Sequence, residues 1–130
     1  YLCQENLIRL AKQYDIEVTA FSPLGSLSYV ELEMAEQEES ILDQAVIKDI
    51  ANRLDCSPAQ VLLRWGMQRG TSILVKSTSP ERMTENLLAI NIDLNVDDMK
   101  VISSLNRNRR FNDPGNFCEG AFNTFHPIYD

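Results

Sequence analysis

The chain contains the run Ile73-Leu74-Val75-Lys76-Ser77-Thr78-Ser79-Pro80-Glu81-Arg82, followed by Glu85-Asn86. Its first three residues are apolar and bounded by polar ones, which is typical of a short buried strand. Ser79 is a favoured helix N-cap. Pro80 suits the first helical position, because the N–H that it lacks would be unpaired there anyway. The run therefore predicts a strand, a polar loop and a helix that begins after Ser79.

This junction has the chemistry of an anion site. The unpaired N–H groups of a first helical turn carry partial positive charge, and Lys76 and Arg82 add two full charges. Arg82, Glu85 and Asn86 stand at i, i+3 and i+4, so they share one helical face. A guanidinium can grip a phosphate, and a carboxylate with an amide suits a purine edge. The pattern predicts NADP rather than NAD; the alternative is a capped surface helix whose charges face water.

The composition limits the class of protein. The chain has 130 residues, of which 44% are hydrophobic and 24% charged, as in one globular domain. A net charge of -7 argues against nucleic acid as a partner. No apolar run approaches the roughly 20 residues of a membrane span, and no signal segment is recognisable, so we expect a cytoplasmic protein without a membrane partner. Cys3, Cys56 and Cys118 lack metal-like spacing, so no metal site is expected.

The first third of the chain predicts a helix, a strand and two loops. Leu7, Ile8 and Ala11 have helical spacing, and residues 16–21 alternate with β-branched side chains before residues 22–26 break the pattern. Residues 27–40 have little periodicity and include five glutamates, which is typical of a long loop or lid. Such a charge run is either a solvated face or a partner-binding surface.

The remainder predicts three more helices besides the one after Ser79. Residues 41–54 carry an apolar stripe that predicts a helix. Ser57 with Gln60 has the features of a capping box and begins a helix that ends at Gly70. Asn95 with an acidic residue three positions later begins a last helix. Strand, loop and helix in repetition indicate a parallel α/β fold, in which the loops after both strands share one face.

Three segments in this order resemble the C-terminal part of aldo-keto reductases, NADP-dependent enzymes built on a (β/α)8 barrel. The segments are Val18-Thr19-Ala20-Phe21-Ser22-Pro23-Leu24-Gly25-Ser26, Ser57-Pro58-Ala59-Gln60-Val61-Leu62-Leu63-Arg64-Trp65, and the run from Lys76 to Arg82 with Glu85-Asn86. The resemblance implies an α/β fold that forms about the last two βα units of a TIM barrel over residues 1–106, with a substrate-loop tail over residues 107–130. It also implies that NADPH reduces a small-molecule carbonyl substrate, an aldehyde or an aldose.

The resemblance assigns a cofactor role to ten positions. The ring of Phe21, where the family often has Tyr, is expected to stack on the nicotinamide. The residues expected to line the pyrophosphate are Ser22, Leu24 and Ser26. Those expected to hold the 2′-phosphate end of the adenosine are Lys76, Ser77, Thr78 and Arg82. Those expected to bind the adenine are Glu85 and Asn86.

The tail resembles a narrower group of the family. Arg110-Phe111-Asn112-Asp113-Pro114 is similar to a run in xylose and aldose reductases, where the C-terminal loop lines the substrate mouth. The resemblance implies that Asn112 hydrogen-bonds a sugar hydroxyl. The alternative is a turn stabilised by Asn, Asp and Pro.

No catalytic residue is expected in this chain. In the family, the catalytic Tyr, Lys, Asp and His come from the first half of the barrel, before the matched segments. Two strands cannot close an eight-stranded barrel, so we expect the missing N-terminal half of the barrel as a partner. The chain also begins at Tyr1 rather than Met, which suggests a piece of a longer protein. The alternative hypothesis is a non-catalytic NADP-binding or interaction subunit.

Overall fold

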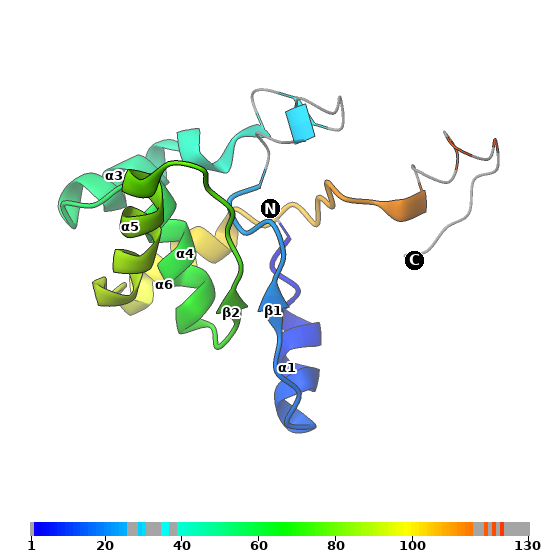
Figure 1. Cartoon of the computed structure of the whole chain (residues 1–130). Coiled ribbons are helices and arrows are strands. Elements are labelled where there is room, and N and C mark those ends of the chain that lie inside the picture. Colours follow the sequence, from blue (N-terminus) through cyan, green and yellow to red (C-terminus); the bar gives the residue numbers. More distant parts are fainter. Residues whose placement is uncertain are drawn as a thin grey trace.

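The computed structural model describes residues 2–25, 29–30, 35–36, 39–115, 119, 121 and 123. Its helices and strands form an α/β arrangement in which two short strands lie beside a group of helices (Figure 1). The α-helices of this part of the chain are α1 (Glu5–Gln13), α3 (Ala45–Arg53), α4 (Pro58–Gln68), α5 (Pro80–Leu88) and α6 (Val96–Ser104). The strands are β1 (Thr19–Ala20) and β2 (Ser72–Ile73), and the 3-10 turns are η2 (Ile41–Asp43) and η3 (Ala89–Asn91).

The two strands pair in parallel, with Thr19 opposite Ser72 and Ala20 opposite Ile73. Because parallel strands point the same way, the loops that follow them leave from one edge, as the sequence predicts. Both strands are shorter than expected, since residues 16–21 and 73–75 were predicted to be extended throughout. Within the described residues each strand pairs only with the other. The outer edge of each strand therefore lacks the backbone hydrogen bonds that a further strand would supply.

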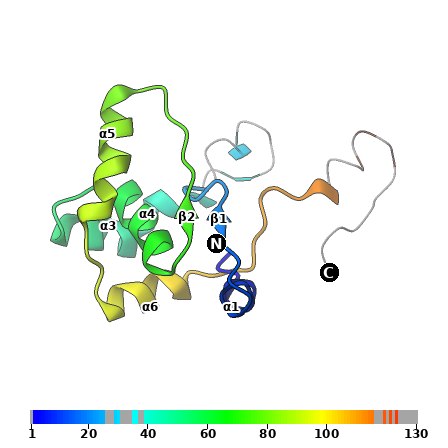
Figure 2. The same ribbon diagram turned by 60° about the horizontal axis from the view of Figure 1, so that its bottom comes forward.

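The core lies among α3, α4 and α6. Ile47 of α3 and Val61 of α4 have no exposed surface, and Ile102 of α6 is buried with them. Figure 2 shows α3 and α4 between α5 and α6. The predicted helix over residues 41–54 is wrong in one respect, because Gln44 is extended (φ -63°, ψ 131°) and separates η2 from α3. The Gln44 carbonyl accepts the first hydrogen bonds of α3, so the helix begins there.

The predicted helix starts are confirmed. Ser57 and Gln60 form a reciprocal capping box at α4, and Asn95 and Asp98 form another at α6. The Asp98 carboxylate also pairs with the Arg53 guanidinium at 2.5 Å, which ties α6 to α3. These caps pair N–H groups that the first turn of a helix would otherwise leave without a partner.

Helix α4 packs closely against β2. A Cβ atom on Gly66 would stand 2.5 Å from Cδ1 of Ile73, so the contact leaves no room for a side chain. Just after α4, the Thr71 hydroxyl donates to the Gly66 carbonyl at 2.8 Å. The close approach packs β2 against α4 just before the loop that follows β2.

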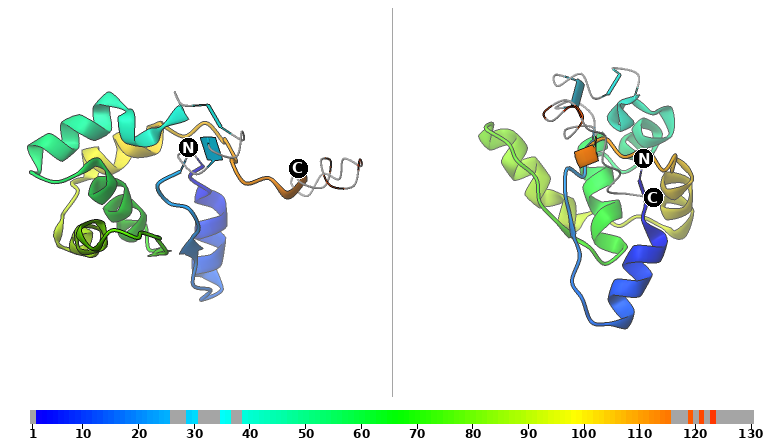
Figure 3. Two further views of the ribbon diagram at one scale, coloured as in Figure 1. Left: turned by 45° about the horizontal axis from the view of Figure 1, so that its top comes forward. Right: turned by 90° about the vertical axis from the view of Figure 1, so that its right-hand side faces the viewer.

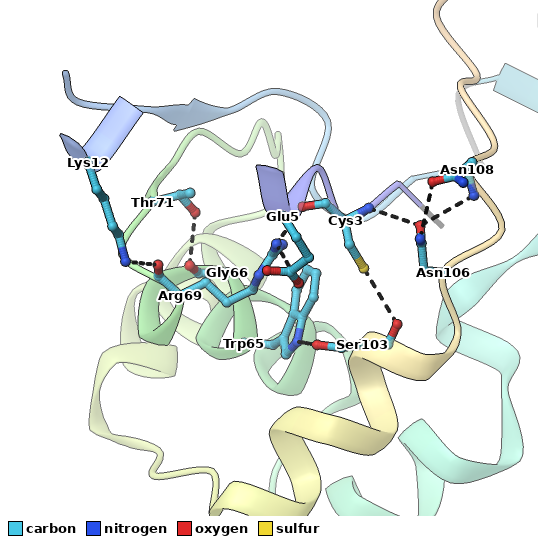
Figure 4. A network of polar contacts seen from close by, with 10 residues as sticks. All are labelled: Cys3, Glu5, Lys12, Trp65, Gly66, Arg69, Thr71, Ser103, Asn106 and Asn108. Atoms are coloured by element: carbon cyan, nitrogen blue, oxygen red, sulfur yellow. Dashed lines mark hydrogen bonds and ion pairs between the residues drawn. The ribbon is translucent and has the colours of Figure 1, made fainter. Parts of the chain in front are cut away.

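Helix α1 is attached to the end of α4 through Arg69 (Figure 4). The Arg69 guanidinium lies 4.2 Å from the centre of the Trp65 ring, pairs with Glu5 at 2.9 Å and donates to the Cys3 carbonyl. Lys12 of α1 donates to the Arg69 carbonyl at 2.7 Å. One arginine therefore joins the N-terminal segment to the helical core.

The segment after α6 runs away from the helical group, past the N-terminus (Figures 1 and 3). It brings residues 109–112 beside the loop that follows β1. None of the helices in the described residues has the length and apolar character needed to cross a bilayer.

Candidate functional site

The loop between β2 and α5 is held by short-range hydrogen bonds. The Ser77 hydroxyl accepts from the Ser79 N–H at 3.2 Å, and the Ser79 hydroxyl accepts from the Arg82 N–H at 3.3 Å. Ser79 is thus the N-cap of α5, with Pro80 at the first helical position, as predicted. The loop and the start of the helix form one ordered unit in which Lys76 and Thr78 are exposed.

Two cations of this unit have no partner among the residues that the structure describes. Within the described part of the chain, the side chains of Lys76 and Arg82 make no hydrogen bond or ion pair, and both are exposed. Glu81 lies between Lys76 and Arg82 in the sequence. The Ser79 hydroxyl donates to the Glu81 carboxylate at 2.6 Å, which lowers the pKa of Glu81. The loop and helix start therefore carry two cations without a partner among the described residues and one ionised carboxylate. The residues present fit a phosphate group, with a net positive charge of one.

Glu85 and Asn86 follow one turn later on α5, and both are half-buried. Glu85 contacts the start of α4, because the Ser57 hydroxyl donates to its carboxylate and Gln60 Nε2 donates to its backbone carbonyl at 2.9 Å. The helix that carries Arg82, Glu85 and Asn86 is confirmed, with the spacing that places them on one face. What these three side chains bind stays a prediction.

The loop after β1 forms a second group of candidate residues. Phe21 is 70% exposed, and Ser22 has a positive φ of 49°, which turns the chain sharply at the strand end. Leu24 packs against the helical core. Ser26 lies outside the described residues. The structure thus places Phe21 and Ser22 where a ligand can reach them and uses Leu24 for packing.

A cavity of about 450 Å³ opens beside these strand ends. Phe21, Ser22, Tyr29 and Asn112 contribute to its lining. The Tyr29 hydroxyl donates to Ser22 Oγ at 3.1 Å, and the Tyr29 ring stacks on Phe111 with 5.6 Å between ring centres. The cavity therefore brings Asn112 of the tail together with the two residues after β1. Sequence reasoning did not assign Tyr29 this place, because nothing local marks it.

The tail is fastened to the acidic loop at this cavity. The Arg109 guanidinium binds the Glu39 carboxylate at 2.9 Å and lies 5.0 Å from the Phe111 ring centre. The hydrogen bond from Arg109 lowers the pKa of Glu39. Asp113 accepts from the Gly115 N–H at 2.9 Å, so a side-chain-stabilised turn follows Asn112. The structure is compatible with a substrate contact of Asn112, because Asn112 lines the cavity. It is also compatible with the alternative of a stabilised turn, because such a turn forms directly after Asn112.

The candidate residues thus form two groups. The cavity lining reaches Ile73 of β2 but none of Lys76, Ser77, Thr78 or Arg82. One group surrounds the end of β1 and the other surrounds the start of α5, at the same edge of the sheet. Two separate groups suit an elongated ligand with different chemistry at its two ends. The described residues hold no cluster of His, Cys, Asp or Glu that could bind a metal ion.

Known proteins similar to the chain share one class. The family model described as aldo/keto reductase family matches residues 2–107. A probable NAD(P)H-dependent D-xylose reductase of Neosartorya fischeri is 47% identical over 116 residues, which are 88% of this chain and 36% of that protein. An NAD(P)H-dependent D-xylose reductase of Kluyveromyces lactis is 43% identical over 129 residues, 96% of this chain and 39% of that protein.

A third relative differs in the cofactor that its name states. It is the NADH-dependent D-xylose reductase of Candida parapsilosis, 38% identical over 119 residues, which are 90% of this chain and 37% of that protein. The chain therefore spans 36% to 39% of the length of these three relatives.

Proposed function

Because the chain belongs to the aldo/keto reductase family, we propose that it is part of an enzyme that reduces an aldehyde or aldose carbonyl to the alcohol with NADPH. The family is built on a (β/α)8 barrel, and β1, α4, β2 and α5 correspond to its last two βα units. In this proposal the chain supplies the adenosine-phosphate and pyrophosphate sites and part of the substrate mouth. The proton donor comes from the part of the barrel outside this chain.

The free cations at the start of α5 carry the proposal. Lys76 and Arg82 are exposed and have no partner within the described residues, although 19 acidic side chains give the chain a net charge of -7. In so acidic a protein, two unpaired cations beside a helix N-terminus indicate an anionic ligand. The 2′-phosphate is the group that distinguishes NADPH from NADH. The proposal therefore assigns Lys76 and Arg82 to that phosphate, with Ser77 and Thr78 as neutral donors.

The second group of residues accounts for the other end of the cofactor. The exposed ring of Phe21 offers a face on which a nicotinamide can stack, which would orient the ring that gives up the hydride. The proposal assigns Ser22 to the pyrophosphate; Ser26, which the sequence also predicts there, lies outside the described residues. Asn112 lines the same cavity as Phe21, which supports the proposal that it hydrogen-bonds a substrate hydroxyl. The cofactor supplies the hydride. In the proposal these residues hold the nicotinamide and the substrate carbonyl in the relative position that hydride transfer requires.

Replacing Arg82 with alanine in the complete protein tests the proposal. In the proposal the guanidinium contacts only the extra phosphate. NADPH should therefore bind about 10- to 150-fold more weakly, which corresponds to the loss of about 1.5–3 kcal/mol for a charged hydrogen bond, while NADH should change little. Dissociation constants from cofactor fluorescence measure both. Lys100→Ala is the matched control, because it removes an exposed cation from α6. Equal weakening of NADPH and NADH by Arg82→Ala would take Arg82 out of this role.

A further inference from the structure

The start of α4 lies against the middle of α5, and its two capping residues reach across. In the capping box, Ser57 Oγ accepts from the Gln60 N–H at 3.2 Å, and Gln60 Oε1 accepts from the Ser57 N–H at 3.0 Å. These contacts use the acceptor atoms of both side chains. The donor atoms remain, and both are directed to Glu85: the Ser57 hydroxyl to its carboxylate and Gln60 Nε2 to its backbone carbonyl at 2.9 Å.

Glu85 is consequently held at two points, its side chain and its main chain. Arg82, one turn earlier on the same face, has no such support within the described residues. The Ser57 contact occupies Oε1 of Glu85 and leaves Oε2 without a protein partner among the described residues. An ionised carboxylate only accepts hydrogen bonds, so Oε2 is an oriented acceptor. A side chain fixed before the ligand arrives loses less freedom on binding.

We propose that Ser57 and Gln60 are positioning residues for cofactor recognition, and that they orient Glu85 so that its free oxygen accepts from the 6-amino group of adenine. This inference rests on the proposed function and deepens it. The capping box has two roles in it, since its acceptors stabilise the start of α4 and its donors hold α5. A carboxylate acceptor favours adenine over a purine that carries a carbonyl oxygen at position 6, because two acceptors facing each other repel.

A comparison of two cofactors measures this orientation. Nicotinamide hypoxanthine dinucleotide phosphate has a 6-oxo group where NADPH has the 6-amino group, and the two share every phosphate. The ratio of their dissociation constants therefore cancels effects on charge and on the stability of the site. For the unaltered complete protein we expect a ratio of about ten or more in favour of NADPH, as for a polar group left facing a mismatched partner.

Two variants remove the donors and keep the cap. Aspartate at position 57 is a good N-cap, and glutamate at position 60 preserves the capping box, yet neither carboxylate can donate to Glu85. Ser57→Asp and Gln60→Glu should each lower the ratio severalfold. Ser57→Asp should have the larger effect, because its carboxylate would also repel that of Glu85. A melting curve of each variant shows whether it is folded. Ser57→Thr keeps the hydroxyl and should keep the ratio.

The outcomes separate this inference from the proposed function. If the unaltered protein discriminates and Ser57→Asp and Gln60→Glu discriminate equally well, Glu85 needs no positioning and the inference falls alone. If the unaltered protein binds NADPH and the hypoxanthine analogue equally, Glu85 does not read the 6-amino group, and again only the inference falls. If it does not bind NADPH, the proposed function falls and the inference with it.

Discussion

The helical layer of α3, α4 and α6 and the strand-end region around the cavity are held together in different ways. In the helical layer, Ile47 and Val61 are completely buried. In the strand-end region, Phe21 is 70% exposed and Leu74 is 65% exposed. The contacts among the described residues there include an ion pair, a ring stack and a hydroxyl hydrogen bond. One region is fixed by apolar burial and the other by a few polar and aromatic contacts.

The two halves of the candidate cofactor site lie in these two differently stabilised regions. The proposed adenosine end lies on α5, which is hydrogen-bonded to the capping box of α4 and so belongs with the helical layer. The proposed nicotinamide end follows β1, a strand of two residues whose other edge is unpaired among the described residues. Burial of apolar surface contributes about 25 cal/mol per Å², far more in total than a few surface contacts. We therefore expect the adenosine end to be the more rigid of the two.

The largest effect should come from a cavity in the helical layer. Ile47→Ala removes three carbons from a side chain with no exposed surface and should lower the free energy of unfolding by about 2–5 kcal/mol. Urea denaturation of the complete protein measures the change. Val96→Ala is the control, since Val96 is 68% exposed and its replacement should change stability by less than about 0.5 kcal/mol. Similar losses for both would refute the contrast drawn here.

An intermediate effect should follow from opening the cap of α6. Asp98 accepts from the Asn95 N–H at 3.1 Å and binds Arg53 at 2.5 Å, and its carboxylate is 9% exposed. Asp98→Ala should therefore cost about 1.5–3 kcal/mol, as for a hydrogen bond to a charged group. Asp97→Ala is matched in type and position, but that side chain is 93% exposed and should cost below about 1 kcal/mol. The same urea titration compares the two.

The smallest effect should lie in the strand-end region. Arg109 lowers the pKa of Glu39 below its ordinary value of 4.5, so the ionised form is favoured in the folded state. The pair therefore stabilises the protein above about pH 4.5 and loses that contribution as the pH falls through the lowered pKa. Because the pair is partly exposed, we expect less than about 1 kcal/mol.

Glu39→Gln tests that sign. The variant should be slightly less stable than the unaltered protein at pH 7. The difference should shrink in acid, as the pH falls below 4.5 and through the lowered pKa of Glu39. A difference that grows on acidification would contradict the role of the Arg109 pair. Stability measured in urea at the two pH values gives the comparison.

The sequence predicted the parts of the fold that depend on neighbours a few residues apart. Ser57 with Gln60, Ser79 with Pro80, and Asn95 with Asp98 each begin a helix as expected, because a cap requires only residues three positions apart. The order of the elements and the parallel edge from which both loops leave also agreed. The extents of the strands did not, since a strand continues only where another strand pairs with it.

Contacts between distant residues could not be predicted. Ser57 and Glu85 are 28 positions apart, and Arg109 and Glu39 are 70 apart. Nothing in the composition of either segment specifies its partner. The sequence singled out Glu85 as a ligand contact by its spacing from Arg82, but the support from α4 became visible only when the two helices were placed together. The break at Gln44 was missed for a similar reason, because the apolar stripe continues across it.

Gly66 has a consequence for anyone who redesigns this molecule. A methyl group at position 66 would stand 2.5 Å from Cδ1 of Ile73, so the end of that side chain would have to turn away from α4. Ile73 belongs to the strand that leads into the loop of Lys76. Attempts to redesign the loop should therefore leave Gly66 untouched, so that Ile73 keeps its place against α4.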